Sequence, residues 1–143
     1  MLLQDGVPNT QWLYDWAQSY QPADFNTVVI HGSDDGRFGE APVGGTVSPD
    51  IIAQLLKSAK GYDPKLPTQL VACSAGATKT GAQALANALG ATVLAAAQIL
   101  NPGPTLGSPP LAAVPPNTFW GILLLQPPPP RPPITWIPFL PQK

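Results

Sequence analysis

Two side chains in this sequence have the chemistry of an acyl-transfer site, and each is the single residue of its type. His31 ends the apolar run 27–31, and Cys73 ends the apolar run 68–73. A thiol attacks carbonyl carbons as the thiolate, and an adjacent imidazole is the usual means of removing its proton. The pair therefore suggests a Cys-His dyad, with Cys73 as the nucleophile and His31 as the acid and base.

Both runs predict elements that would bring the pair together. Each is short and uncharged and contains β-branched or large apolar residues, which is typical of a strand buried on both faces. Parallel α/β sheets bind their ligands at the carboxyl ends of strands. We therefore expect His31 and Cys73 at the matching ends of two strands, each followed by a turn whose N–H groups are suited to binding an oxyanion.

The rest of residues 1–100 alternates helices with strands. Such alternation is produced by a parallel sheet with right-handed crossover connections. The predicted order is a helix over 9–20, the strand 27–31, a helix from 48, the strand 68–73, a helix over 79–89 and a strand over 91–97. The sequence thus predicts an α/β fold with a mainly parallel sheet.

Capping signals and apolar spacing locate the helices. Ser48, Pro49 and Asp50 combine a capping hydroxyl, a proline at the first helical position and an acid in the first turn. The expected apolar faces are Trp12, Leu13 and Trp16 after a cap at Asn9 or Thr10; Ile51, Ile52, Leu55, Leu56 and Ala59 before Gly61; and Leu85, Ala86 and Leu89 before Gly90.

Residues 32–47 are rich in glycine and charge, and we expect a long loop at the rim of the sheet. Its charged side chains are interpreted as solvated, and their spacing does not match a calcium loop. They are Asp34, Asp35, Arg37 and Glu40. We assign no metal and no cofactor.

Proline divides the chain into a core, 1–100, and an extension, 101–143, which holds 14 of the 20 prolines. The extension contains two apolar segments, 118–125 and 134–139, and Pro138 restricts the second to a sheet edge. We expect them to form a hairpin packed on the core, after an extended loop over 101–117. An alternative is that the proline run is a polyproline ligand for a partner's aromatic groove.

Composition excludes several classes of partner. The net charge is −1 and only 10% of residues are charged, so neither nucleic acid nor an anionic membrane is expected as a partner. The beginning of the chain lacks a basic segment followed by an apolar core, so we expect no signal peptide. Its apolar runs are shorter than the ~20 residues that span a bilayer.

Two other interpretations of the site remain. A single cysteine that ends a buried strand is often a small hydrophobic residue, and a single histidine is often a packed one. Ser74 is a rival nucleophile, because the residues around it approximate the strand–turn–helix elbow of α/β-hydrolases. That architecture places its histidine after the serine, and no histidine follows here.

An apolar run ending in His-Gly and, 42 residues later (73 − 31), one ending in Ala-Cys resembles a known clan of cysteine peptidases. The clan contains caspases, gingipains, legumain and the self-processing domains of large bacterial toxins. The resemblance covers residues 27–97 and implies a caspase-like three-layer sandwich with a mainly parallel sheet. It implies that Cys73 is the nucleophile, that His31 is the acid and base, and that the amides of Gly32 and Cys73 bind the oxyanion.

More narrowly, the segments IHGS, GGTVSPDIIAQLL, LVACSAGA and GAQALANALGATVLAA, with the terminal stretch Trp136–Pro141, resemble C-terminal domains of polymorphic bacterial toxins. The resemblance implies an effector that cleaves a protein substrate, is delivered into a target cell as part of a larger toxin, and is neutralised by a cognate immunity protein. A Cys-His deamidase and a non-catalytic interaction module with a buried Cys73 are the alternatives.

Overall fold

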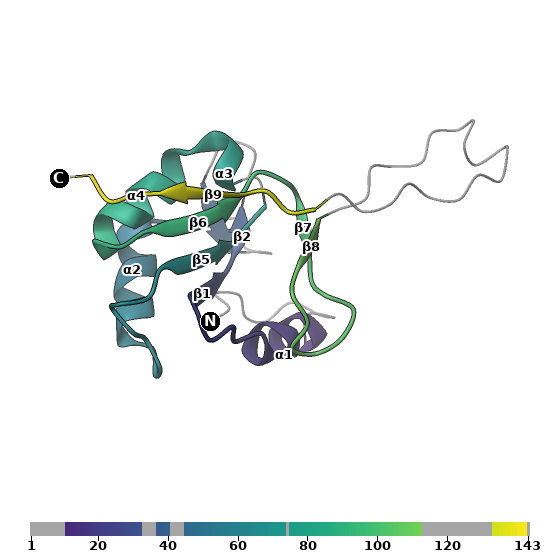
Figure 1. The fold of residues 1–143 in the computed structure, drawn as a ribbon. Coiled ribbons are helices and arrows are strands. Elements are labelled where there is room, and N and C mark those ends of the chain that lie inside the picture. Colours follow the sequence, from purple (N-terminus) through teal and green to yellow (C-terminus); the bar gives the residue numbers. More distant parts are fainter. Residues whose placement is uncertain (1–10, 33–36, 41–44, 74, 113–132, 143) are drawn as a thin grey trace, which may run out of the picture.

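The computed structural model describes residues 11–32, 37–40, 45–73, 75–112 and 133–142 (Figure 1). The elements are α1 (Gln11–Ser19), β1 (Asn26–Val29), β2 (His31–Gly32), β3 (Phe38–Glu40), β4 (Gly45–Val47), α2 (Pro49–Ser58), β5 (Thr68–Val71), α3 (Ala75–Thr78), α4 (Thr80–Leu89), β6 (Val93–Ala96), β7 (Leu100–Asn101), β8 (Leu111–Ala112) and β9 (Trp136–Phe139).

The main sheet has four strands in the order β1-β5-β6-β9. β1 pairs in parallel with β5, and β5 with β6, whereas β9 runs antiparallel to β6. The α/β fold with a mainly parallel sheet is therefore confirmed. Pro138 lies in β9 at the edge of this sheet, where its missing N–H costs no ladder hydrogen bond, as the sequence predicted.

Helices cover the two faces of the main sheet (Figure 1). On one face α2 and α4 pack against alternate strand residues, among them Val28, Leu70 and Val93. On the other face α1 contributes Trp16, Ala17 and Tyr20, which form a cluster with Val29 and Val71. Since successive strand side chains point to opposite faces, Val28 and Val29 belong to different clusters.

Two of the expected helix boundaries are confirmed by their caps. The Ser48 hydroxyl accepts a hydrogen bond from the Ile51 N–H at 3.3 Å, and Pro49 begins α2. Gly90 ends α4 with a left-handed φ of 67°, which only glycine adopts without strain, and its N–H donates to the Ala86 carbonyl.

The expected faces of two helices need correction. Trp12 is 46% exposed, so Trp16 is the tryptophan through which α1 contacts the sheet. In α2, Ile51 and Leu55 are exposed, and the buried face is Ile52, Ala53 and Leu56. The apolar residues of α2 cover more than one face, so periodicity alone did not determine which side meets the sheet.

Two expected loops contain strands instead. Within 32–47, β2, β3 and β4 form an antiparallel sheet whose Phe38 side chain is buried in the α2–α4 cluster. Within 101–117, β8 pairs with β7. Of the two segments expected to form a hairpin, 134–139 contains β9, which pairs with β6. The other segment, 118–125, lies outside the described residues, as do the expected helix caps Asn9 and Thr10. No helix in the described ranges is both long and apolar enough to span a membrane.

Candidate functional site

His31 and Cys73 follow two paired strands at the same end of the main sheet. β1 and β5 are in parallel register, with Val29 opposite Val71, and the Ile30 N–H donates to the Val71 carbonyl at 3.1 Å. His31 lies two residues after Val29, and Cys73 lies two residues after Val71. His31 is exposed, and Cys73 is a half-buried free thiol. The expected placement at adjacent carboxyl ends is thus observed.

Gly32 brings the two strand ends into direct contact. A Cβ atom at this position would overlap the carbonyl oxygen of Cys73 and lie 3.0 Å from its amide nitrogen. Real Cβ atoms do not approach backbone atoms so closely, so the approach requires glycine. The backbones of Gly32 and Cys73, whose amides the resemblance assigns to the oxyanion, therefore lie side by side.

A small antiparallel sheet fixes the position of the histidine segment. His31 is the register partner of Gly39, and Gly32 is the partner of Phe38. Phe38 is only 2% exposed and anchors β3 in the core. The segment that carries His31 is therefore attached to the core through β3 as well as through β1.

Alternation along the strands places both candidate residues, His31 and Cys73, on the face of the sheet that α1 covers. Val29 and Val71 belong to the α1 cluster, and His31 and Cys73 are each two positions further along. The Cys73 thiol donates a hydrogen bond to the Leu100 carbonyl, with the sulfur 3.7 Å from the oxygen. Leu100 packs on the same cluster, which agrees with this orientation of Cys73.

The chain after Cys73 contains one short helical turn that the sequence did not predict. This turn, α3, begins at Ala75, and α4 begins at Thr80, close to the expected start of the helix over 79–89. Lys79 separates them with a φ of 67°, an unfavourable backbone conformation for a residue with a side chain. The ten-residue helix α4 begins seven positions after Cys73 (80 − 73), beyond the short turn α3.

Two hydrogen bonds, one buried and one partly buried, hold α1 in place on this face of the molecule. The Tyr20 hydroxyl donates to Gln69 Oε1 at 2.8 Å, and Trp16 Nε1 donates to the Ser108 carbonyl at 2.9 Å. Burial raises the pKa of the Tyr20 phenol, and the hydrogen bond to Gln69 acts in the opposite direction. These partners and Leu100 could not be found from the sequence, because none of them is near in sequence to the residue it contacts.

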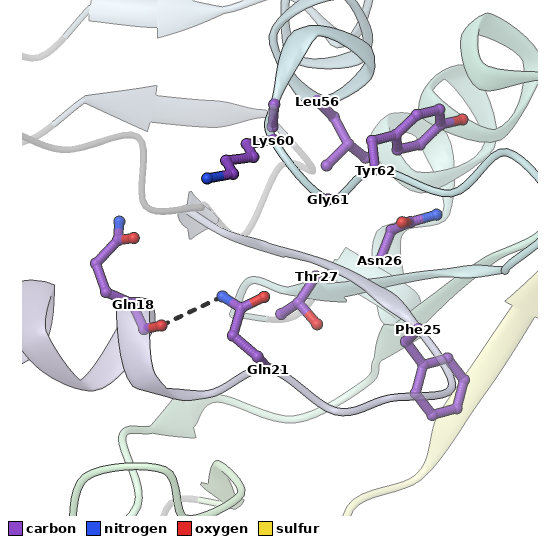
Figure 2. Close-up of a pocket in the computed structure, with 10 residues that line it drawn as sticks. Gln18, Gln21, Phe25, Asn26, Thr27, Leu56, Lys60, Gly61 and Tyr62 are labelled. Atoms are coloured by element: carbon purple, nitrogen blue, oxygen red, sulfur yellow. Dashed lines mark hydrogen bonds between the residues drawn. The ribbon is translucent and has the colours of Figure 1, made fainter.

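A cavity of about 280 Å³ lies away from His31 and Cys73, at the amino end of β1 (Figure 2). Gln18, Gln21, Asn26 and Lys60 contribute polar groups to its lining. Because His31 follows the opposite end of β1, this cavity belongs to a different part of the molecule. Within the described residues no group of three or more His, Cys, Asp or Glu side chains is placed to hold a metal; Asp34, Asp35 and Ser74 lie outside them.

Comparison with known proteins gives one match. No curated protein and no solved structure matches the chain. A family model described as a domain of unknown function, DUF8616, matches residues 5–106, which is more than half of the sequence and includes β1 to β7 with both His31 and Cys73. The chain is thus a member of the DUF8616 family.

Proposed function

We propose that this domain is a cysteine peptidase-like hydrolase that acts through His31 and Cys73. The observation that carries the proposal is the placement of the two residues after paired parallel strands, with the Gly32 backbone against that of Cys73. A single cysteine or histidine is weak evidence for catalysis. Two such residues in adjacent register at one end of a sheet are stronger evidence, because ligand sites of parallel sheets lie there.

The proposed reaction follows from these groups. His31 removes the thiol proton, and Cys73 Sγ attacks the carbonyl carbon of a peptide bond. The N–H groups of Gly32 and Cys73 stabilise the oxyanion, and the leaving amine takes the proton from His31. Water then hydrolyses the thioester and regenerates the thiol. No cofactor is required.

We include in this proposal a caspase-like three-layer arrangement of the fold. Helices on both faces of the sheet support a caspase-like three-layer sandwich. The sequence segments that resemble polymorphic toxin domains support an effector delivered as part of a larger toxin, with a protein substrate and a cognate immunity protein as its partners.

The test is expression of the full chain in the bacterial cytoplasm as wild type, Cys73→Ala and His31→Gln. We expect wild type to reduce viability and to generate new protein N-termini, and both substitutions to abolish these effects. Ser58→Ala, which changes an exposed hydroxyl on α2, is the control and should behave as wild type. Toxicity that survives Cys73→Ala would contradict the proposal. Deamidated glutamine or asparagine without new N-termini would indicate a deamidase that uses the same dyad.

A non-catalytic interaction module is the second candidate, and one observation favours it. The Cys73 sulfur is only partly accessible and already has the Leu100 carbonyl as a hydrogen-bond acceptor. In such a module the thiol would be labelled by iodoacetamide only after denaturation. Labelling of the native protein, slowed by His31→Gln, would instead support the dyad.

A further inference from the structure

We propose that strand β7 is an internal occupant of the acyl site, which keeps the domain latent and indicates the substrate that displaces it. The proposal rests on the proposed function, since it assigns a substrate class to the same dyad. It implies that the substrate is an extended peptide segment whose attacked carbonyl belongs to an apolar residue.

The first observation is the contact between the thiol and a peptide carbonyl. Leu100 presents its carbonyl oxygen 3.7 Å from the Cys73 sulfur, with the thiol donating. A substrate for thiol attack must present a peptide carbonyl to this same sulfur. A substrate carbonyl that approached the sulfur from the same side would have to displace the carbonyl of Leu100. Figure 1 shows β7 beside the end of the main sheet where β5 ends, in agreement with this contact.

The second observation is the surroundings of the Leu100 side chain. Together with Trp136, it packs on the α1 cluster, formed by Trp16, Ala17, Tyr20, Val29 and Val71. None of these residues is charged, so a charged side chain in the place of the half-buried Leu100 would lose part of its hydration without gaining a partner from the cluster. An apolar side chain gains free energy from the same burial.

The third observation is that β7 is held at two places. It pairs antiparallel with β8, with Leu100 opposite Ala112 and Asn101 opposite Leu111. The turn that follows is tied to α1, because the Gly107 N–H donates to Ser19 Oγ at 2.7 Å and Ser108 accepts from Trp16. A peptide that replaces β7 would therefore find two ready sites, the β8 edge for its backbone and the α1 cluster for its side chain.

The test of latency measures iodoacetamide labelling of Cys73 in the intact chain. Leu100→Ala removes the packed side chain and should speed labelling about tenfold, since each 1.4 kcal/mol of lost local stability shifts the opening equilibrium by that factor. Ile99→Ala is the matched control, because Ile99 is 55% exposed and adjacent in sequence. Its labelling rate should equal that of wild type.

A second pair of variants, Ser19→Ala and Ser58→Ala, removes only a hydroxyl group and keeps the proposal testable if Leu100→Ala unfolds the protein. Ser19 and Ser58 are both helical serines whose hydroxyls donate to a carbonyl one turn earlier, but Ser19 also accepts from Gly107. Ser19→Ala should speed labelling about threefold by loosening the β7–β8 turn, and Ser58→Ala should not. Equal rates for Ser19→Ala and Ser58→Ala would overturn the latency proposal.

Substrate class is tested with tripeptide aldehydes that end in leucinal, argininal or aspartal. Addition forms a bond between Sγ and the aldehyde carbon, and the thiol proton moves to the former carbonyl oxygen, so the product is a reversible hemithioacetal. Leucinal should protect Cys73 from labelling at concentrations at least about tenfold lower than the charged aldehydes. Equal protection by all three would overturn the apolar subsite. If leucinal protects but no protein is cleaved by the wild type, the subsite stands and the peptidase function fails.

Discussion

The two faces of the main sheet are stabilised in different ways. The face covered by α2 and α4 carries a large apolar cluster with members from every strand of the main sheet, among them Val28, Leu70, Val93 and Phe139. The α1 face carries a smaller cluster and adds specific hydrogen bonds, which Tyr20 and Trp16 donate and which Ser19 accepts from Gly107. Apolar burial is non-directional, whereas hydrogen bonds fix orientation.

This difference indicates a division of roles. The α2–α4 face supplies most of the stability, and the α1 face positions Cys73, Leu100 and the β7–β8 turn. Sites of function need exact geometry more than they need stability, and they are often less stable than the core of the same protein. The following predictions test this division, in order of decreasing effect.

Val28→Ala and Val29→Ala compare the two faces directly, since both valines lie in β1 and are buried. Each substitution removes roughly 1.6 kcal/mol of burial at about 0.8 kcal/mol per methylene. Val28→Ala should cost about 2–3 kcal/mol, because the large cluster relaxes little around the cavity, and Val29→Ala about 1–2 kcal/mol. Urea denaturation measures both. A larger loss for Val29→Ala would contradict the division.

Gly32→Ala should affect the site more than the fold. The new methyl group meets the Cys73 carbonyl and must push the two strand ends apart, at a cost of about 1–3 kcal/mol. We expect the effect of His31 on thiol labelling to disappear, so that adding His31→Gln changes nothing further. Val28→Ala, with a similar loss of stability on the opposite face, is the control and should keep that effect.

Tyr20→Phe tests the polar component of the α1 face. It leaves Gln69 Oε1 buried without its donor, which should cost about 1–2 kcal/mol at pH 7. Because burial raises the pKa of Tyr20 in the folded state, the unfolded chain ionises first, near pH 10. The contribution of Tyr20 is therefore complete below pH 10 and is lost as the pH rises through the raised pKa.

Urea denaturation of wild type and Tyr20→Phe at pH 7 and at pH 10.5 measures this prediction. The stability difference between the two proteins should shrink at the higher pH. A difference that stays constant would show that the phenol ionises alike in both states.

Thr68→Val should have the smallest effect and the opposite sign. Thr68 is fully buried on the α2–α4 face, and its hydroxyl has no hydrogen-bond partner among the described residues. Replacing the hydroxyl with a methyl group of similar shape removes a desolvated polar group and should stabilise the protein by about 1 kcal/mol. A lower thermal midpoint for the variant would contradict this assignment.

Local sequence signals predicted the parts of the molecule that local forces determine. The β1 and β5 segments, the Ser48 cap and the Gly90 cap follow from burial, hydrogen bonding and backbone conformation within a few residues. Because both strands were located, the adjacent ends at His31 and Cys73 could also be expected.

Features that depend on distant contacts could not be predicted. Glycine and charge in 32–47 indicated a loop, but burial of Phe38 stabilises strands there. The exposed positions of Ile51 and Leu55 depend on which side of α2 meets the sheet. The contact of Leu100 with Cys73 joins residues 27 positions apart, and nothing in either local sequence encodes it.

The antiparallel position of β9 has a consequence for how the chain folds during synthesis. Ala96 and Trp136 are register partners although 40 positions separate them (136 − 96). Closing a loop of that length costs roughly 3 kcal/mol of chain entropy. Until residue 139 has left the ribosome, β6 has an open edge, which is a place where nascent chains pair wrongly.

The Gln98 side chain helps to hold β9 in place on the edge of the sheet. Its carboxamide accepts from the Thr135 N–H at 3.1 Å and donates to the Pro133 carbonyl at 2.9 Å, so it extends the strand ladder to the residues that precede β9. Gln83 on α4 donates to the Leu140 carbonyl beyond the other end of β9. Completion of the sheet thus requires residues 136–139, and a ribosome that stalls before residue 136 would hold a nascent chain whose sheet lacks its edge strand.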